Sequence, residues 1–317
     1  MKNKTIVGLF LFIILVIIAG FSIFINVAKS MTSNRRVFGA SYMTLVNPFF
    51  SVLDDGIREI LEAHGDKLIS YDAGNDQLKQ IDQIQDFINK KVSAIFLNPV
   101  DLYLIEPALR AAKKAGIPII NVDTPVYNQE LVDCLVMSDN YKAGQLVAMD
   151  LIRRKQGARI ALIDHLSAKS AMDRAEGFKS IIANYATFNI VARYSSDGNI
   201  EQALSGMESI LRDVPNIDVV FATNDPSAMG VIAALESAHL LGKILVYGVD
   251  GAPYAKKMIL ESKMTATAAQ SPVEIGRVAA DMAYRIIKGE KVEKQLYVPI
   301  YLINKENVNN YGVNSWQ

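Results

Sequence analysis

The sequence predicts an α/β protein made of two doubly wound domains, each with a parallel sheet between layers of helices. From residue 37 onward, short β-rich runs alternate with amphipathic helical patterns. This alternation is typical of βαβ units, whose strands are parallel and whose helices cover both faces of the sheet. About ten strands would make one very wide sheet, and a chain of this length suits two domains better than one. We therefore expect two smaller sheets.

The expected strands and helices follow from hydrophobic periodicity. Runs rich in β-branched and aromatic residues predict strands, and apolar residues at a helical spacing predict helices. The strands are expected at residues 37–41, 67–71, 94–97, 118–122, 134–137, 159–163, 189–193, 219–222, 244–248 and 265–269. The helices are expected at residues 49–63, 77–89, 105–114, 141–155, 175–183, 201–212, 227–238 and 273–288. Gly116 and Gly289 directly follow two of these patterns, as is usual at helix ends.

The N-terminus reads as an export segment. Lys2 and Lys4 precede an uncharged apolar run over residues 5–28. Such a basic start and apolar run predict that residues 1–30 are a signal peptide or an N-terminal membrane anchor, followed by a linker at residues 31–36. The run is longer than the ~7–15 residues of a signal core and close to the ~20 that span a bilayer, which favours an anchor. Small residues flank Lys29, so cleavage there is the alternative. Either way, we expect an extracytoplasmic protein, in the periplasm or on the outer face of the cytoplasmic membrane.

Composition excludes some classes of function. Lys and Arg together number 33, as do Asp and Glu. No basic excess exists to hold nucleic acid, so no nucleic-acid partner is expected. Cys134 is the only cysteine, so no intramolecular disulfide can form. No cysteine stands directly after the apolar run, in residues 29–36, which excludes a lipid-attached mature N-terminus.

Polar side chains follow six of the expected strands. In an open α/β sheet, ligands bind beyond the carboxyl ends of the strands. Residues at these ends therefore form a candidate ligand-binding site, with two aromatic side chains at the start of the first helix. They are Asn47, Phe49, Phe50, Asp123, Arg174, Asn224, Asp250 and Gln270.

Each of these residues also has an ordinary structural explanation. A single Asp or Asn at a strand end is more often a turn residue or a helix N-cap than a ligand contact. We interpret Asp225 in this way, as the cap of the helix at residues 227–238. Phe49 and Phe50 could be core residues, and Arg174, at the end of a loop, could form a surface salt bridge. Six such strand ends together favour binding.

The chemistry of these side chains suits a sugar. Asn, Asp, Gln and Arg form paired hydrogen bonds, and a sugar offers neighbouring hydroxyl groups that both donate and accept. Aromatic rings can cover the apolar C–H face of a sugar ring. No strand end carries a nucleophilic cysteine or a His beside a Ser, and the three His residues are scattered. We expect no catalytic residue, no metal and no cofactor.

Eight segments carry a further signal in their order and spacing. They are Asn47-Pro48-Phe49-Phe50, Leu97-Asn98-Pro99, Ala115-Gly116-Ile117-Pro118, Ser138-Asp139-Asn140, Arg174-Ala175-Glu176-Gly177-Phe178, Phe221-Ala222-Thr223-Asn224-Asp225, Gly248-Val249-Asp250-Gly251-Ala252-Pro253, and Ala268-Ala269-Gln270-Ser271-Pro272 with Ile275-Gly276. No one segment is decisive, but together they are highly specific. Over residues 37–303, the chain resembles the ribose-binding branch of the periplasmic sugar-binding proteins.

The resemblance implies two lobes that close around a ligand, joined by three crossings of the chain near residues 137–139, 270–271 and 299–301. The N-terminal lobe would comprise residues 37–138 and 271–300, and the C-terminal lobe residues 139–270 and 301–317. By the same analogy, the first lobe contributes Asn47, Phe49, Phe50 and Asp123 to the ligand. The second lobe or its hinge contributes Arg174, Asn224, Asp250 and Gln270.

Three departures from the family pattern bear on the ligand. Thr124 stands where the ribose binder has an arginine, and Met43 replaces a serine at the first strand end. The family has a ring-stacking phenylalanine in the second lobe, and its position corresponds to a place near Gly198 in this chain. These changes remove a charge and bulk, so we expect a different pentose, a hexose or a polyol rather than ribose itself.

Two functions remain open for such a binder. The first is capture of a sugar and delivery to the permease of an ABC importer. The second is a membrane-tethered sensor that presents its sugar-bound state to a histidine kinase or chemoreceptor. Both would use the same cleft in a monomeric binding domain. An enzyme would need an acid/base pair of carboxyl groups; Asp123 and Asp250 are available, but Arg174 would keep a neighbouring carboxylate ionised.

Overall fold

The computed structural model describes residues 35–317. The signal peptide or anchor predicted for residues 1–30, and most of the linker predicted for residues 31–36, lie outside the described residues. From residue 35 onward, no helix combines the length and the apolar composition needed to cross a membrane.

The first of two six-stranded sheets is wholly parallel and holds mainly the N-terminal part of the chain. Its strands are β1 (Val37–Tyr42), β2 (Lys67–Asp72), β3 (Ile95–Leu97), β4 (Ile119–Val122), β5 (Cys134–Ser138) and β11 (Gln295–Val298). They lie in the order β11-β5-β4-β3-β1-β2.

The second sheet repeats this arrangement with one antiparallel edge strand. Its strands are β6 (Ala158–Asp164), β7 (Phe188–Ser195), β8 (Val219–Ala222), β9 (Leu245–Asp250), β10 (Ala266–Ala269) and β12 (Tyr301–Asn304). They lie in the order β12-β10-β9-β8-β6-β7, and only the pairing of β12 with β10 is antiparallel. The predicted fold class, with two separate doubly wound sheets, is confirmed.

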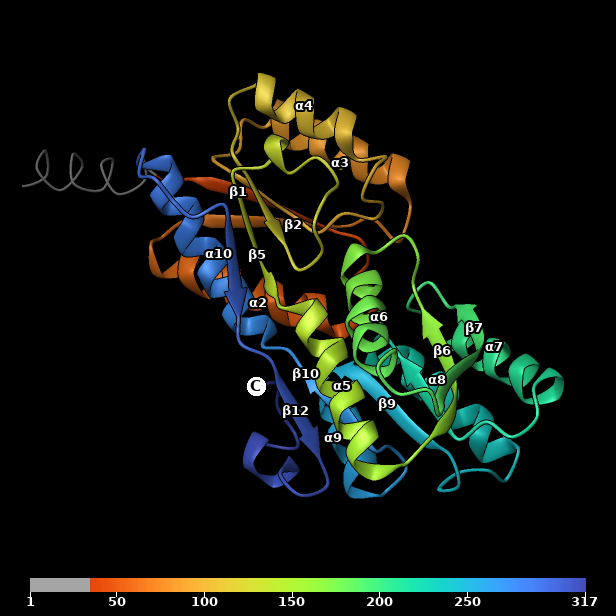
Figure 1. The fold of residues 1–317 in the computed structure, drawn as a ribbon. Coiled ribbons are helices and arrows are strands. Elements are labelled where there is room, and N and C mark those ends of the chain that lie inside the picture. Colours follow the sequence, from red (N-terminus) through yellow and green to blue (C-terminus); the bar gives the residue numbers. More distant parts are fainter. Residues whose placement is uncertain (1–34) are drawn as a thin grey trace, which may run out of the picture.

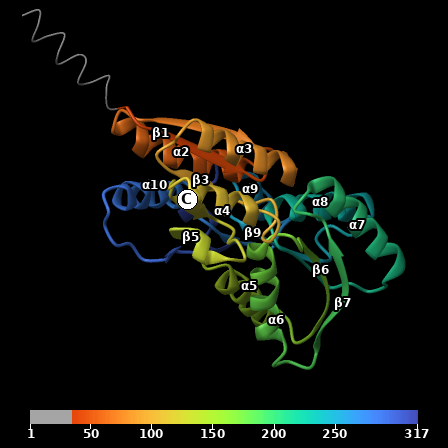
Figure 2. The ribbon, with the colours of Figure 1, turned by 90° about the horizontal axis from the view of Figure 1, so that it is seen from above.

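Helices cover both faces of each sheet (Figures 1 and 2). They are α2 (Pro48–Ala63), α3 (Gln77–Asn89), α4 (Glu106–Lys114), α5 (Asn140–Arg154), α6 (Lys169–Ile182), α7 (Ile200–Asp213), α8 (Asp225–Ser237), α9 (Pro253–Leu260) and α10 (Pro272–Ile287), with the short 3-10 helices η1 (Gln129–Leu131) and η2 (Val308–Tyr311).

Alternation within a single strand explains the two layers of helices. In β3, Ile95 and Leu97 pack in a core with Phe87 of α3, whereas Phe96 packs in another core with Leu53 of α2. Successive side chains of a strand point to opposite faces, so an entirely apolar strand needs cover on both sides. This is why the buried strands read as continuous apolar runs in the sequence.

The chain passes between the two sheets three times. The first passage lies between β5 and β6, where α5 packs against α6 of the second lobe. The second lies between β10 and β11, where α10 packs against α2 of the first lobe. The third is the short connection from β11 to β12. Figure 1 shows the two lobes joined where these three passages lie.

Some elements differ from the sequence-based expectation. The strands β11 and β12 and the helix α9 were not predicted. Both strands lie at or near sheet edges and expose a tyrosine each, Tyr297 and Tyr301, so they lack the continuous apolar run of a central strand. Helix α6 begins at Lys169 rather than at residue 175. The earlier start left no capping signal in the sequence, because Ala168 is the N-cap and makes no side-chain capping bond. Arg174 is therefore inside a helix and not at the end of a loop.

Candidate ligand-binding site

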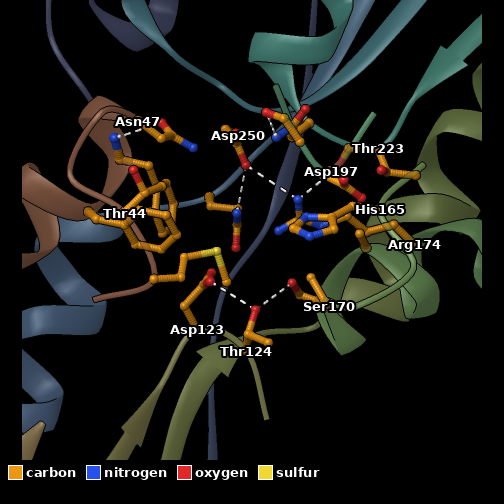
Figure 3. Close-up of a pocket in the computed structure, with 18 of the residues that line it drawn as sticks. Thr44, Asn47, Asp123, Thr124, His165, Ser170, Arg174, Asp197, Thr223 and Asp250 are labelled. Carbon is orange, nitrogen blue, oxygen red and sulfur yellow. Dashed lines mark hydrogen bonds and ion pairs between the residues drawn. The ribbon is translucent and has the colours of Figure 1, made fainter. Parts of the chain in front are cut away.

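One pocket lies between the two sheets and is lined by side chains of both lobes (Figure 3). Figure 3 shows Thr44 and Asn47 on one side of the pocket and His165 and Asp197 on the other. All eight residues predicted from the strand ends line it: Asn47, Phe49, Phe50, Asp123, Arg174, Asn224, Asp250 and Gln270.

The aromatic wall of the pocket is set by the start of α2. Asn47 is the N-cap of this helix, and its side-chain oxygen accepts a hydrogen bond of 3.0 Å from the backbone N–H of Phe49. The cap places Phe49 and Phe50 in the first turn, with ring centroids 5.4 Å apart and planes at 86°. Both side chains are buried, so they belong to the core and to the pocket wall at once.

Asp123 reaches the pocket from a strained backbone position directly after β4. Its φ is 63°, a left-handed value that non-glycine residues adopt rarely. One carboxylate oxygen, Oδ2, accepts hydrogen bonds from Thr124 Oγ1 at 3.1 Å and Asn98 Nδ2 at 3.2 Å. Burial raises the pKa of Asp123, and the nearby positive charge of Arg174 opposes the rise.

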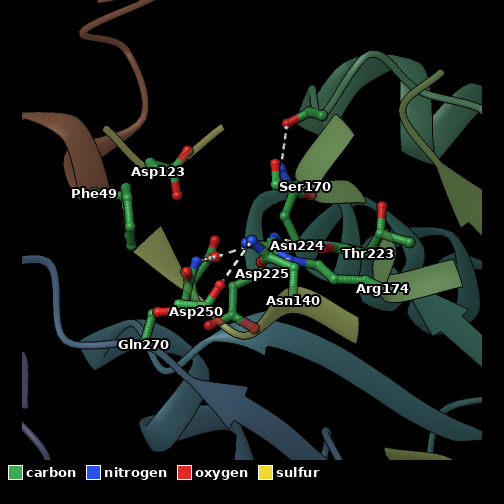
Figure 4. Close-up of polar contacts among 12 residues, drawn as sticks. Phe49, Asp123, Asn140, Ser170, Arg174, Thr223, Asn224, Asp225, Asp250 and Gln270 are labelled. Carbon is green, nitrogen blue, oxygen red and sulfur yellow. Dashed lines mark hydrogen bonds and ion pairs between the residues drawn. The ribbon is translucent and has the colours of Figure 1, made fainter. Parts of the chain in front are cut away.

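Arg174 is held in place by neighbours of the second lobe. Its Nε donates to Asn140 Oδ1 and its Nη1 donates to the carbonyl oxygen of Thr223, both at 2.8 Å (Figure 4). Gly144 of α5 allows α6 to approach closely, since a Cβ there would lie 1.9 Å from the carbonyl oxygen of Arg174. The side chain is almost fully buried, so the alternative of a surface salt bridge is wrong.

Asp250 and Gln270 form the floor of the pocket next to Arg174. Asp250 Oδ1 accepts from Gln270 Nε2 at 2.9 Å and lies 3.5 Å from Arg174 Nη1. Burial raises the pKa of Asp250 to about 8; Arg174 opposes this rise, and the negative charge of Asp225 adds to it. The expectation that Arg174 keeps a neighbouring carboxylate ionised is therefore wrong for Asp250, because burial outweighs the attraction of the guanidinium group. The φ of Asp250 is 136°, another value that favours glycine. Gln270 Oε1 is buried and has no hydrogen-bond partner among the residues that the structure describes.

Asn224, and not Asp225, caps helix α8. The Asn224 side chain accepts from the backbone N–H of Ser227 at 2.9 Å and donates to the carbonyl oxygen of Gly198 at 3.1 Å. Our interpretation of Asp225 as the cap is therefore wrong. Asp225 is fully buried and accepts from Thr267 Oγ1 and from the backbone N–H of Ala252.

Several pocket residues were not found from the sequence. They are Thr44, Asn75, His165, Ala168, Ser170, Ala171, Asp197 and Thr223, beside the three departures Met43, Thr124 and Gly198. His165 directly follows β6, and Asp197 follows β7 after one residue. The strand-end rule that found Asp123 would have found both.

A side chain at Gly198 would crowd the pocket wall of the second lobe. The φ of Gly198 is 71°, and a Cβ there would lie 3.0 Å from Asn224 Nδ2 and 3.2 Å from His165 Nδ1. His165 Nε2 lies 2.8 Å from Ser167 Oγ, so the expectation that no strand end carries a His beside a Ser is wrong for β6. Burial lowers the pKa of His165, so its ring favours the neutral form. The aromatic contacts of the pocket therefore come from the first lobe, while this wall of the second lobe is polar.

The arrangement offers hydrogen bonding rather than metal coordination. In the part of the chain from residue 35 to the end, no three His, Cys, Asp or Glu side chains cluster so as to hold a metal ion. The pocket combines buried carboxylates, amides, one guanidinium group and two aromatic rings, which are the groups that bind a small polyhydroxylated molecule.

Comparison with known proteins agrees with this geometry. Residues 38–291 match the family described as "Periplasmic binding protein domain". The ribose import binding protein RbsB of Bacillus subtilis is 36% identical to the chain over 278 residues, which cover 86% of this chain and 89% of that protein. The D-apiose import binding protein of Actinobacillus succinogenes is 31% identical, covering 89% and 94%.

A solved structure shows the same architecture. The ABC transporter solute-binding protein of Bacillus halodurans, crystallised with bound myo-inositol, superposes with a TM-score of 0.83. The two chains are 29% identical, and the match covers 87% of this chain and 97% of that one.

Proposed function

The chain belongs to the family of periplasmic binding protein domains, and on this basis we propose that it captures a monosaccharide or polyol outside the cytoplasm and delivers it to an ABC sugar importer. The relatives described above are named for ribose and D-apiose import, and the similar crystal structure holds myo-inositol. The observation that supports the proposal most is that the eight side chains predicted as sugar contacts line one pocket between the lobes.

In this proposal each group has one task toward the ligand. Asp123 and Asp250 accept hydrogen bonds from sugar hydroxyl groups, and Arg174 donates to them. Gln270 Oε1, which is buried and finds no partner within residues 35–317, accepts from a further hydroxyl group. Phe49 covers the apolar face of the ring, with Phe50 behind it. Only a closed cleft brings groups of both lobes to one small ligand, so binding favours closure.

The ligand class follows from the departures within the pocket. Thr124 removes an arginine from the first lobe, and the polar wall at Asp197, Gly198 and His165 replaces an aromatic contact in the second. A polar wall can form hydrogen bonds with the hydroxyl groups of a ligand. An aromatic ring at the same place would instead pack on the apolar C–H face of a sugar ring. We therefore propose a pentose other than ribose, a hexose or a polyol.

We also propose that the protein is a monomeric binder without enzymatic activity. Donors of the protein hold one carboxyl oxygen of each group, Oδ2 of Asp123 and Oδ1 of Asp250, and so fix the position of the other oxygen for recognition. A bound sugar should be recovered unchanged after long incubation, as chromatography of the released ligand would reveal.

The lobes of this binder would be residues 37–138 with 271–300, and residues 139–270 with 301–317.

The N-terminal segment is part of the same proposal. We propose that the apolar run at residues 5–28 remains on the protein as an anchor and holds the binding domain at the outer face of the cytoplasmic membrane. A tethered binder stays close to its permease, and the same tether would serve a sensor that contacts a histidine kinase or chemoreceptor. Sugar uptake by cells lacking the protein separates the two roles: import requires uptake to fall, whereas a sensor alters only the sugar-dependent response.

Calorimetric titration of a chain that begins at residue 31, against pentoses, hexoses and polyols, tests the proposal directly. We expect saturable binding of one sugar and a smaller radius of gyration in X-ray scattering when that sugar is bound. A protein that binds none of these compounds would refute the proposed function, and binding without compaction would refute closure.

A further inference from the structure

The segment that follows β12, residues 305–317, returns to the junction of the two lobes. It forms the short helix η2 and then an irregular stretch, residues 312–317. Figure 1 shows the C-terminus between α2 and α10 of the first lobe and β12 of the second. We call residues 312–317 the terminal strap. No residue of the strap lines the ligand pocket, yet the strap touches three residues that do.

A buried lysine of the second lobe holds the strap. Lys256 of α9 has no exposed surface, and its Nζ donates to the carbonyl oxygens of Tyr311 and Ser315, at 3.1 and 2.5 Å, and to Gln317 Oε1 at 3.0 Å. A lysine ammonium group has three N–H donors, so this segment takes all of them. Burying a charge is costly unless it is fully hydrogen-bonded, so the strap and Lys256 depend on each other.

Gln317 ties the strap to the backbone of two pocket residues. Its Nε2 donates to the carbonyl oxygen of Asp250 at 3.0 Å and also to that of Gln270. Gly251 makes this approach possible, since a Cβ there would lie 2.3 Å from Gln317 Nε2. One side-chain amide thus joins the two loops that carry the polar floor of the pocket.

Trp316 extends the strap to the other lobe. Its ring lies 5.9 Å from that of Phe49, at an interplanar angle of 75°. It packs against the core that contains Phe49 and also against the core beneath β8 and α8 of the second lobe. The strap is therefore held by one lobe while it supports the aromatic wall contributed by the other.

We propose that Trp316 and Gln317 are positioning residues of the binding site, which set the places of Phe49, Asp250 and Gln270 in the closed cleft. This inference rests on the proposed function of the cleft. It also predicts a signal: Trp316 is the only tryptophan of the chain, and it lies where the lobes meet. Its fluorescence should therefore change when a ligand closes the cleft.

Trp316→Ala and Tyr311→Ala form a matched pair that tests the proposal. Both side chains are half-buried in the same segment, but Tyr311 packs only against the second lobe, beside Tyr301. With D-ribose, D-allose and myo-inositol as probes, Trp316→Ala should weaken the binding seen for the parent by about tenfold, and Trp316→Phe should restore most of it. Tyr311→Ala should leave affinity within about twofold of the parent at a comparable loss of thermal stability. Equal affinities for the two alanine variants would overturn the inference.

Ligand-free measurements keep the test independent of the proposed function. Without sugar, Trp316→Ala should increase the radius of gyration relative to Tyr311→Ala, and Gln317→Ala should make Trp316 more accessible to a soluble quencher. If no compound of the full panel of pentoses, hexoses and polyols binds the parent, the proposed function fails, while these two measurements still decide the role of the strap. Unchanged scattering and unchanged quenching would overturn it.

Discussion

Thr124 Oγ1 lies 2.6 Å from Ser170 Oγ, and this hydrogen bond joins the two lobes directly across the cleft. Thr124 follows β4 of the first sheet, and Ser170 lies in the first turn of α6 beside the second. Both side chains are buried. Thr124 Oγ1 also donates to Asp123 Oδ2, so Ser170 supplies the proton of the bond between the lobes. Thr124, one of the three expected departures from the family pattern, thus contacts the opposite lobe.

Ser170→Ala should shift the ligand-free protein toward an open form. Losing one buried hydrogen bond of the closed state costs about 1 kcal/mol, so apparent sugar affinity should fall about threefold to tenfold. Scattering of the ligand-free variant should give a larger radius of gyration. The control is Ser196→Ala, which removes a similar buried hydroxyl pair with Ser227, 2.8 Å long, inside the second lobe. If both variants scatter alike, Thr124 and Ser170 do not control closure.

Asp250→Asn and Asn224→Ser should both weaken sugar binding. Loss of a hydrogen-bond partner in a closed, dry cleft costs about 1–3 kcal/mol for either residue. Because Asn224 caps α8, Asn224→Ala would also destabilise the helix by about 1 kcal/mol, whereas serine preserves the cap. Titration together with thermal melting separates the two effects. Near-parental affinity in Asp250→Asn and Asn224→Ser would show that neither residue contacts the ligand.

Phe49→Leu should reduce both stability and affinity, because Phe49 packs in the core and lines the pocket. We expect a loss of about 1–2 kcal/mol in stability and about 1 kcal/mol in binding through the lost ring contact. Phe87→Leu is the control, since Phe87 is a fully buried core residue of the same lobe that lies outside the pocket. It should lower the melting temperature without changing affinity. An equal change in affinity for both variants would mean that Phe49 acts only through the core.

The stability of the ligand-free protein should depend on pH through Asp250. Its pKa in the folded chain, about 8, lies above the ordinary value of 3.8, so the folded chain keeps a proton that the unfolded chain releases between these pH values. The contribution of protonated Asp250 to the free energy of unfolding is therefore fully present below about pH 4 and is lost as the pH rises toward 8.

Asp250→Asn removes this titration, so its melting temperature should fall less than that of the parent between pH 5 and pH 8. The control is Asp281→Asn, a change at an exposed position of α10. The melting temperature of this control should fall with rising pH as steeply as that of the parent. An equally steep fall for Asp250→Asn would contradict the raised pKa.

The N-terminal anchor is tested on protein recovered from its native membrane. We expect the mass of the full chain, with the protein in the membrane fraction, because the apolar run at residues 5–28 is near the ~20 residues that span a bilayer. A chain that begins at residue 31 and is recovered in the soluble fraction would show a cleaved signal peptide instead.

The sequence predicted the strands that carry the site because these strands are buried on both faces. A strand such as β8, with every residue buried, leaves an apolar run that is hard to mistake. The strands β11 and β12 escaped prediction because each exposes part of its surface. In the same way, Asp123 and Asp250 were found because they directly follow or end a buried strand, whereas Asp197 follows β7, which is only partly buried.

Contacts between distant segments could not be predicted from local pattern. Thr124 and Ser170 are 46 residues apart in the chain. They meet only because the fold brings the end of β4 and the start of α6 together across the cleft. Lys256 appears in the sequence as an ordinary charged residue outside every predicted helix, yet the fold buries it entirely. Asn224 and Asp225 are equally good caps by composition, and only the backbone at the end of β8 decides between them.

The backbone conformations of Asp123 and Asp250, with φ values of 63° and 136°, have a consequence for engineering this protein. Each such conformation costs on the order of 1–3 kcal/mol in a residue other than glycine, and the two aspartates also keep carboxyl groups away from water. Glycine at either position would relieve the backbone, and would also delete a carboxylate from the cleft. Selection for heat resistance alone therefore favours the same substitutions that disable recognition. Thermostable variants of this chain should be screened with the sugar present, or with both aspartates held fixed.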